Sequence, residues 1–191
     1  MNHIALFVHL AALTWIGLLP RLFFRPGRLT TMWWLTALPF FIAAAVLALA
    51  VTGFVESPPT QGGLLTQWLS LVSVFGSLTA CGLMAASAVA HRVAPALWHQ
   101  SNDEPVDFIC SGPYRYIRHP FYSAYLLVLL SAMLCFPNPV IGGVFVYACL
   151  LLSYTAAKEE RNLLTSRFGA IYAEYCASTG RFFPRWTGKA R

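Results

Sequence analysis

The side chains best suited to chemistry lie in two short polar segments of an otherwise apolar chain. In the first segment, Pro120 suits the first turn of a helix, which would leave Arg118 and His119 at that helix's N-terminus. Backbone N–H groups without helical partners, beside an arginine and a histidine, can bind an anion. The alternative is that these residues and the neighbouring tyrosines only anchor the chain at a membrane surface.

The second polar segment contains two adjacent carboxylates, Glu159 and Glu160. Apolar residues follow at helical spacing, namely Leu164, Phe168, Ile171 and Tyr175, and they predict an amphipathic helix. On that helix Glu160 lies roughly 50° from the centre of the apolar stripe and Glu159 roughly 150° away. We therefore expect Glu159 to face water and Glu160 to face the protein or the membrane. A carboxylate near the bilayer needs a partner, either Arg118 or Arg115 in an ion pair, or a cationic or hydroxyl-bearing ligand.

The composition excludes an ordinary cytosolic domain, a disordered chain and a nucleic-acid-binding module. Of the 191 residues, 58% are hydrophobic and 10% are charged, against about 25% charged in a typical soluble domain. Thirteen Lys and Arg against seven Asp and Glu give a net charge of +6, which among apolar runs is typical of an oriented membrane protein. The five cysteines are scattered without CxxC spacing, so we predict neither a metal centre nor a disulfide framework.

Five apolar stretches predict an all-α integral membrane protein with five transmembrane helices, at residues 3–20, 32–55, 64–90, 121–136 and 139–157. The fourth and fifth are close enough to form a helical hairpin, and the amphipathic helix follows in the cytoplasm. Every basic residue comes after the first, third or fifth span. The positive-inside rule therefore predicts an external N-terminus and a cytoplasmic C-terminus. We expect a single membrane domain over 1–191, with three spans in 1–90 and the catalytic part in 91–191.

The motifs of residues 106–184 together resemble the isoprenylcysteine carboxyl methyltransferase family and its bacterial and archaeal relatives. The matching residues, in chain order, are Gly112-Pro113-Tyr114, Arg118-His119-Pro120-x-Tyr122, Glu159-Glu160-x-x-Leu163, Phe168-Gly169, Tyr172-x-x-Tyr175 and Arg181-x-x-Pro184. The RHPxY element alone is moderately specific, and its combination with the paired glutamates and FGxxYxxY is strongly so.

The resemblance implies S-adenosylmethionine as the cofactor, bound between the loop before the fourth span and the helix after the fifth. The residues that it implies for this role are Val106, Asp107, Phe108 and Ile109, largely through their backbone, with Tyr114, His119, Pro120, Phe121, Tyr122 and Glu160. The active site would then lie on the cytoplasmic side, and a lipophilic acceptor would enter it from the bilayer.

The resemblance leaves the methyl acceptor open. Its eukaryotic members contact the acceptor through an arginine four residues before the second glutamate, and that position is Ala156 here. Arg161 and Arg181 are the candidates to replace it, so a prenylcysteine carboxylate is one possible acceptor. A lipid amine, a thiol or another lipophilic nucleophile is equally open.

Two other function classes compete with the methyltransferase. An NADPH-dependent sterol-type membrane reductase shares a similar RHPxY hairpin, but a 2′-phosphate favours basic residues near the ribose, whereas this helix opens with Glu159 and Glu160. A non-enzymatic membrane scaffold leaves the clustered polar residues unexplained.

Overall fold

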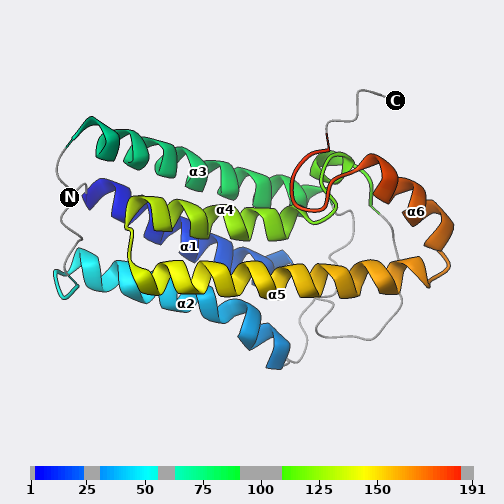
Figure 1. The fold of residues 1–191 in the computed structure, drawn as a ribbon, viewed down its shortest axis with the longest axis horizontal. Helices are drawn as coiled ribbons and strands as arrows, with labels where there is room; N and C mark the ends of the chain where they lie inside the picture. The colour runs from blue at the N-terminus through cyan, green and yellow to red at the C-terminus, as the bar shows by residue number, and fades with distance from the viewer. Residues whose placement is uncertain (1–2, 24–30, 56–62, 91–108, 186–191) are drawn as a thin grey trace.

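The computed structural model describes residues 3–23, 31–55, 63–90 and 109–185 (Figure 1). The helices in these ranges are α1 (His3–Phe23), α2 (Thr31–Val51), α3 (Leu64–Val89), α4 (Pro120–Cys135), α5 (Pro139–Leu164) and α6 (Gly169–Ser178), with a short 3-10 helix, η1 (Gly112–Arg115). The described part has no β-strand, only one isolated bridge between Ile117 and Gly180. The prediction of an all-helical protein is confirmed.

The five long helices lie side by side, with η1, α6 and the C-terminal segment gathered at one end of the bundle (Figure 1). α1 packs against α2, α3 and α4, and α4 packs closely on α3. Small residues permit this close approach: a Cβ added at Gly76 of α3 would fall within 3.5 Å of the Ser131 side chain of α4. Ala80, Ala124 and Ala132 are fully buried in the same core. The bundle therefore provides a rigid support for the polar end.

The helices match the predicted apolar stretches to within a few residues at most ends. Among the described residues, three helical segments are long and apolar enough to cross a membrane: Trp34–Val51, Leu64–Val89 and Pro139–Leu164. The predicted first and fourth spans are shorter apolar helices, His3–Leu18 and Pro120–Cys135. α4 and α5 are joined by residues 136–138 and pack along each other, which is the hairpin that the sequence predicts.

α5 is longer than the hydrocarbon core of a bilayer is thick, so its polar C-terminal end can extend beyond that core. Its 26 residues extend about 39 Å at a rise of about 1.5 Å per residue, whereas the hydrocarbon core of a bilayer is about 30 Å thick. The surplus of about six residues corresponds to the charged turns that contain Glu159 and Glu160. These carboxylates can therefore stand in the headgroup layer while the rest of α5 spans the core.

The predicted amphipathic helix is wrong in its boundaries and in its face. α5 ends at Leu164 and α6 begins only at Gly169, because the chain turns so sharply that a Cβ at Gly169 would lie 2.3 Å from the carbonyl oxygen of Leu164. Leu164 and Ile171 are exposed, and Tyr172 is the buried residue of α6. The apolar stripe is thus divided between two helices that do not share one face.

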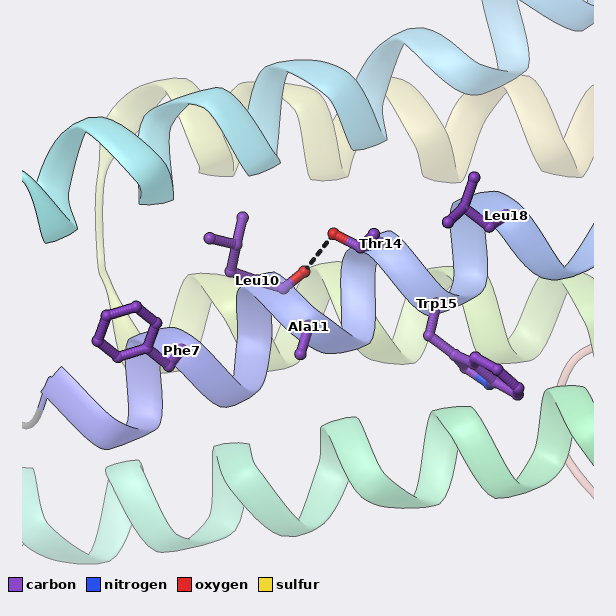
Figure 2. A pocket seen from close by; sticks show the side chains of 6 residues that line it. All are labelled: Phe7, Leu10, Ala11, Thr14, Trp15 and Leu18. Atoms are coloured by element: carbon purple, nitrogen blue, oxygen red, sulfur yellow. Dashed lines mark hydrogen bonds between the residues drawn. The ribbon is translucent and has the colours of Figure 1, made fainter.

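An apolar hollow lies on the outer face of α1 (Figure 2). It is lined by Phe7, Leu10, Ala11, Thr14, Trp15 and Leu18. The Thr14 hydroxyl donates to the Leu10 carbonyl oxygen at 2.8 Å, so this polar side chain is satisfied within its own helix. None of the predicted site residues lines the hollow, and the chemistry must be sought at the polar end of the bundle.

Candidate functional site at the polar end of the bundle

The chain entering α4 is held by a C-terminal strap, which we define as residues 179–182. The Arg118 N–H donates to the carbonyl oxygen of Gly180 at 2.8 Å, and the His119 N–H donates to that of Arg181 at 3.1 Å. The Ser123 hydroxyl donates to the Phe182 carbonyl oxygen at 2.7 Å. We predicted from the sequence that backbone N–H groups at this helix start could bind an anion. In the structure, the N–H groups of Arg118 and His119 are bonded to the strap instead.

Glu160 is the centre of a buried ion-pair cluster. Its Oε1 accepts hydrogen bonds from Arg118 Nε at 2.9 Å and from Arg181 Nε at 3.1 Å, and its Oε2 accepts one from Arg181 Nη2. His119 Nε2 lies 3.2 Å from Oε1. With the residue only 7% exposed, these partners compensate a carboxylate that burial would otherwise penalise. Glu160 therefore does have the ion pair with Arg118 that the sequence left as an alternative.

Arg118 connects this cluster to the end of α6. Besides its bond to Glu160, its Nη1 donates to the carbonyl oxygen of Cys176 at 3.2 Å and to that of Thr179. The Arg118 side chain is 12% exposed, and its Nε and Nη1 both donate to protein acceptors. Arg118 thus fixes α6 and the strap against the start of α4.

Glu159 belongs to the same cluster, and the expectation that it faces water is wrong. Its Oε1 accepts a hydrogen bond from the Tyr122 hydroxyl at 2.8 Å, and its Oε2 lies 3.3 Å from His119 Nδ1. The Glu159 side chain is 20% exposed, against 9% for that of Glu160. Because α5 continues straight past the first turn of α4, both carboxylates meet that turn, and the divided apolar stripe gave the wrong rotation.

His119 lies between the two carboxylates, and its ring stacks on Tyr122 with ring centroids 5.4 Å apart. Burial alone would lower the pKa of His119, but the hydrogen bonds and charges of Glu159 and Glu160 outweigh it and raise the pKa above 6.5. The two carboxylates therefore stabilise the charged imidazolium, and each ring nitrogen lies beside one glutamate.

The raised pKa of His119 predicts a pH-dependent stability. Its contribution is fully present below about pH 6.5, the ordinary histidine value, and is lost as the pH rises through the raised folded-state pKa. We expect wild-type protein in detergent to unfold at a lower temperature at pH 9 than at pH 6, and His119→Gln to lose most of this difference. An unchanged pH profile in the variant would show that another group is responsible.

Two half-buried tyrosines, Tyr114 and Tyr175, lie on the side of the cluster next to η1. The Tyr175 hydroxyl donates to the carbonyl oxygen of Tyr114, and so ties α6 to η1. Burial, with smaller effects from Tyr175 and Glu159, raises the pKa of Tyr114; burial likewise raises the pKa of Tyr175. Both hydroxyls remain protonated and can act as hydrogen-bond donors.

The structure brings together most of the predicted cofactor residues that it describes. Tyr114, His119, Pro120, Phe121, Tyr122 and Glu160 lie in η1, at the start of α4 and near the end of α5, and Ile109 is half-buried ahead of η1. Val106, Asp107 and Phe108 lie outside the described residues. Of the two arginine candidates, Arg181 enters the cluster and Arg161 is exposed on α5.

Sequence reasoning missed the strap as the element that completes the site. The signal in the sequence is the glycine at position 180. In the structure, a Cβ added there would lie 1.8 Å from the Phe183 carbonyl oxygen and 3.1 Å from the Arg185 nitrogen. Only a residue without a Cβ permits the turn that carries Arg181 to Glu160. Periodicity cannot reveal such a turn, because the strap is neither helix nor strand.

Gly180→Ala tests whether this turn holds the site together. We expect a loss of about 1–3 kcal/mol of stability, because the new methyl group must displace the strap and with it Arg181. Thermal unfolding in detergent measures the effect. Gly142→Ala is the matched control, because nothing lies within 4 Å of a Cβ at this α5 position. Equal unfolding temperatures for the two variants would contradict the role of the strap.

Comparison with known proteins relates this chain to a family and to a relative. The family model described as "Isoprenylcysteine carboxyl methyltransferase (ICMT) family" matches residues 71–165, which include α4 and α5. A curated relative, "Cobalt-zinc-cadmium resistance protein CzcN" of Cupriavidus metallidurans, is 34% identical over 77 residues. The match covers 40% of this chain and 35% of the relative, so the chain spans about a third of that protein's length. Within the described ranges, no three or more His, Cys, Asp or Glu side chains are grouped to hold a metal ion.

Proposed function

Because this chain belongs to the isoprenylcysteine carboxyl methyltransferase family, we propose that it is an S-adenosylmethionine-dependent membrane methyltransferase that acts on a lipophilic acceptor. The observation that carries this proposal is the buried charge cluster between the first turn of α4 and the last turns of α5. Four of its members, Arg118, His119, Glu159 and Glu160, fall within the segment matched by the family.

The charges of the cluster suit the methionine part of the cofactor. That part is a zwitterion, with one carboxylate and one ammonium. Arg181, whose side chain is 40% exposed, can turn to the carboxylate while Glu160 accepts from the ammonium or from a hydroxyl. The exchange leaves every buried charge compensated. Tyr114, Pro120, Phe121, Tyr122 and Ile109, with Val106, Asp107 and Phe108 of the preceding loop, are the proposed walls of this binding site.

The cofactor supplies an activated methyl group, so the protein needs to position the reactants and exclude water. His119 and Tyr122 are held in place by Glu159 and Glu160, and they provide a rigid surface at the level of the headgroups. Arg161 and Arg181 remain the candidates for contacting the acceptor, whose hydrophobic part would stay in the bilayer beside α4 and α5. A prenylcysteine carboxylate is one acceptor that this arrangement admits.

We place this site on the cytoplasmic side. All thirteen basic residues follow the first, third or fifth apolar stretch, so five spans with an external N-terminus put every one of them inside. A reporter fused after Arg191 should read cytoplasmic, and one inserted between residues 58 and 63 should read external. A cytoplasmic signal from the second fusion would contradict the five-span arrangement.

Direct titration of the purified chain with S-adenosylmethionine and with NADPH tests the activity class. We expect binding of S-adenosylmethionine and transfer of its labelled methyl group to a lipid-extract component. NADPH binding without S-adenosylmethionine binding would favour the reductase, and binding of neither would favour the scaffold. The reductase is disfavoured because a 2′-phosphate favours basic residues near the ribose, whereas Arg118, His119 and Arg181 are each paired with Glu159 or Glu160.

A further inference from the structure

The outer face of α5 changes character along one line of exposed side chains. These side chains are, in chain order, Val146, Leu150, Tyr154, Lys158 and Arg161. Steps of three or four residues place neighbouring side chains on the same side of an α-helix. The line is therefore apolar first, then aromatic and finally basic, and its basic end lies at the polar end of the bundle.

This line lies opposite the face of α5 that packs into the protein. The buried residues of α5 are Ile141, Ala148, Leu152, Thr155, Ala156 and Glu160. At about 100° per residue, Tyr154 and Arg161 lie roughly 160° and roughly 180° from the centre of this buried stripe, and Lys158 lies roughly 120° from it. The line therefore faces away from the bundle, and it meets lipid where α5 crosses the bilayer.

The order of the side chains matches the layers of a bilayer. Tyrosine is enriched at the boundary between the hydrocarbon core and the head groups, and each head-group layer is about 5–8 Å thick. Lys158 lies about 6 Å beyond Tyr154 along the helix, and Arg161 about 10 Å beyond it. Because long basic side chains can reach back toward the membrane, both cations can contact a lipid phosphate when Tyr154 lies at the boundary.

The basic side chains at this end differ in how far their charges are already compensated. Arg118 and Arg181 are bonded to Glu160. Lys158 and Arg161 form no ion pair with another residue in the ranges that the structure describes. The two are three residues apart on one helix, so their side chains are neighbours, and like charges this close are unfavourable. An anion between them would remove that repulsion.

We propose that Lys158 and Arg161 together bind the phosphate of an anionic phospholipid. The ammonium of Lys158 is a compact charge, and the guanidinium of Arg161 can donate two parallel hydrogen bonds to phosphate oxygens. The acyl chains of the lipid lie along the apolar part of the same line, at Leu150 and Val146. The occupant is a lipid and not a soluble phosphate, because the apolar part of the line continues directly from the basic pair.

This lipid would hold the C-terminal end of α5 at a fixed depth in the membrane. Glu159 and Glu160 directly follow Lys158, so the charge cluster would be held at the level of the head groups. The proposal stands whether or not the chain is a methyltransferase. Where Arg161 holds this lipid, Arg181 is the remaining candidate for contact with the acceptor.

Native mass spectrometry of the full chain in detergent measures the binding of individual lipids. The protein is titrated with phosphatidylglycerol, with phosphatidylcholine, and with phosphatidylglycerol in the presence of inorganic phosphate. We expect phosphatidylglycerol to bind roughly tenfold or more tightly than phosphatidylcholine, because basic residues at the membrane surface favour anionic lipids. Inorganic phosphate should not displace it. Equal affinities for the two lipids, or displacement by inorganic phosphate, would overturn the proposal.

A double variant tests the two residues. Lys158→Gln with Arg161→Gln should weaken phosphatidylglycerol binding about 25-fold, because each basic residue near a membrane surface contributes about fivefold. Arg115→Gln with Arg185→Gln is the control, because it removes the same charge from exposed positions outside α5, and it should have a clearly smaller effect. Equal losses in the two double variants would show a diffuse attraction to positive charge and would overturn the assignment of the site to α5.

Discussion

Glu160→Gln should lower the stability of the folded protein by about 3–5 kcal/mol, the range for removing one partner of a buried ion pair. Glutamine keeps the volume of the side chain but removes the charge that faces Arg118, Arg181 and His119. The cluster would then hold cations packed together without their central anion. The expected loss is large because Arg118 and His119 are shielded from water, with side chains 12% and 9% exposed.

The same substitution should also weaken S-adenosylmethionine binding by about 1.5–3 kcal/mol, the usual value for a hydrogen bond to a charged group. Isothermal titration below the unfolding temperature of the variant separates this effect from the loss of stability. Glu159→Gln is the internal comparison and should weaken cofactor binding less, because Glu159 contacts His119 and Tyr122 and we do not place it against the cofactor. Equal losses of affinity in the two variants would remove Glu160 from the cofactor site and leave it a purely structural role.

The helices could be predicted from the sequence because their signal is local. Long apolar runs define α1 to α5, and prolines mark the starts of α4 and α5. The observed bounds differ from the predicted ones by a few residues at most ends, and by more at the end of α5. The error at α6 is also local: Gly169 makes a contact with Leu164 that an apolar periodicity cannot reveal.

The site was less accessible to sequence reasoning, because its geometry depends on contacts between distant segments. The burial of Glu160 was predicted correctly, but from an apolar stripe that does not exist as one face. The real cause is the pairing of residues 116–119 with the strap, which brings Arg181 to Glu160. The same pairing sets the environment of Glu159 through His119 and Tyr122.

The two arginines of the cluster should differ sharply when each is replaced by methionine. Arg118→Met should lower the stability by about 3–5 kcal/mol, because this buried side chain joins Glu160 to the carbonyl oxygens of Cys176 and Thr179. Arg181→Met should lower it by only about 1 kcal/mol, because the Arg181 side chain is 40% exposed and water can take its place beside Glu160. Denaturant titration in mixed micelles compares the two.

Combining Arg118→Met with Glu160→Gln gives the decisive measurement of this cluster. If the two residues stabilise the fold by compensating each other's charge, the double variant should lose clearly less stability than the sum of the single variants, because neither charge then remains buried alone. Cofactor binding by Arg181→Met should fall while its stability is largely kept, since Arg181 is the side chain we expect to turn to the cofactor carboxylate. Additive losses for Arg118 and Glu160 would show that the two residues do not stabilise the fold as a compensating pair. A larger loss of stability in Arg181→Met than in Arg118→Met would show that Arg181 is the main partner of Glu160.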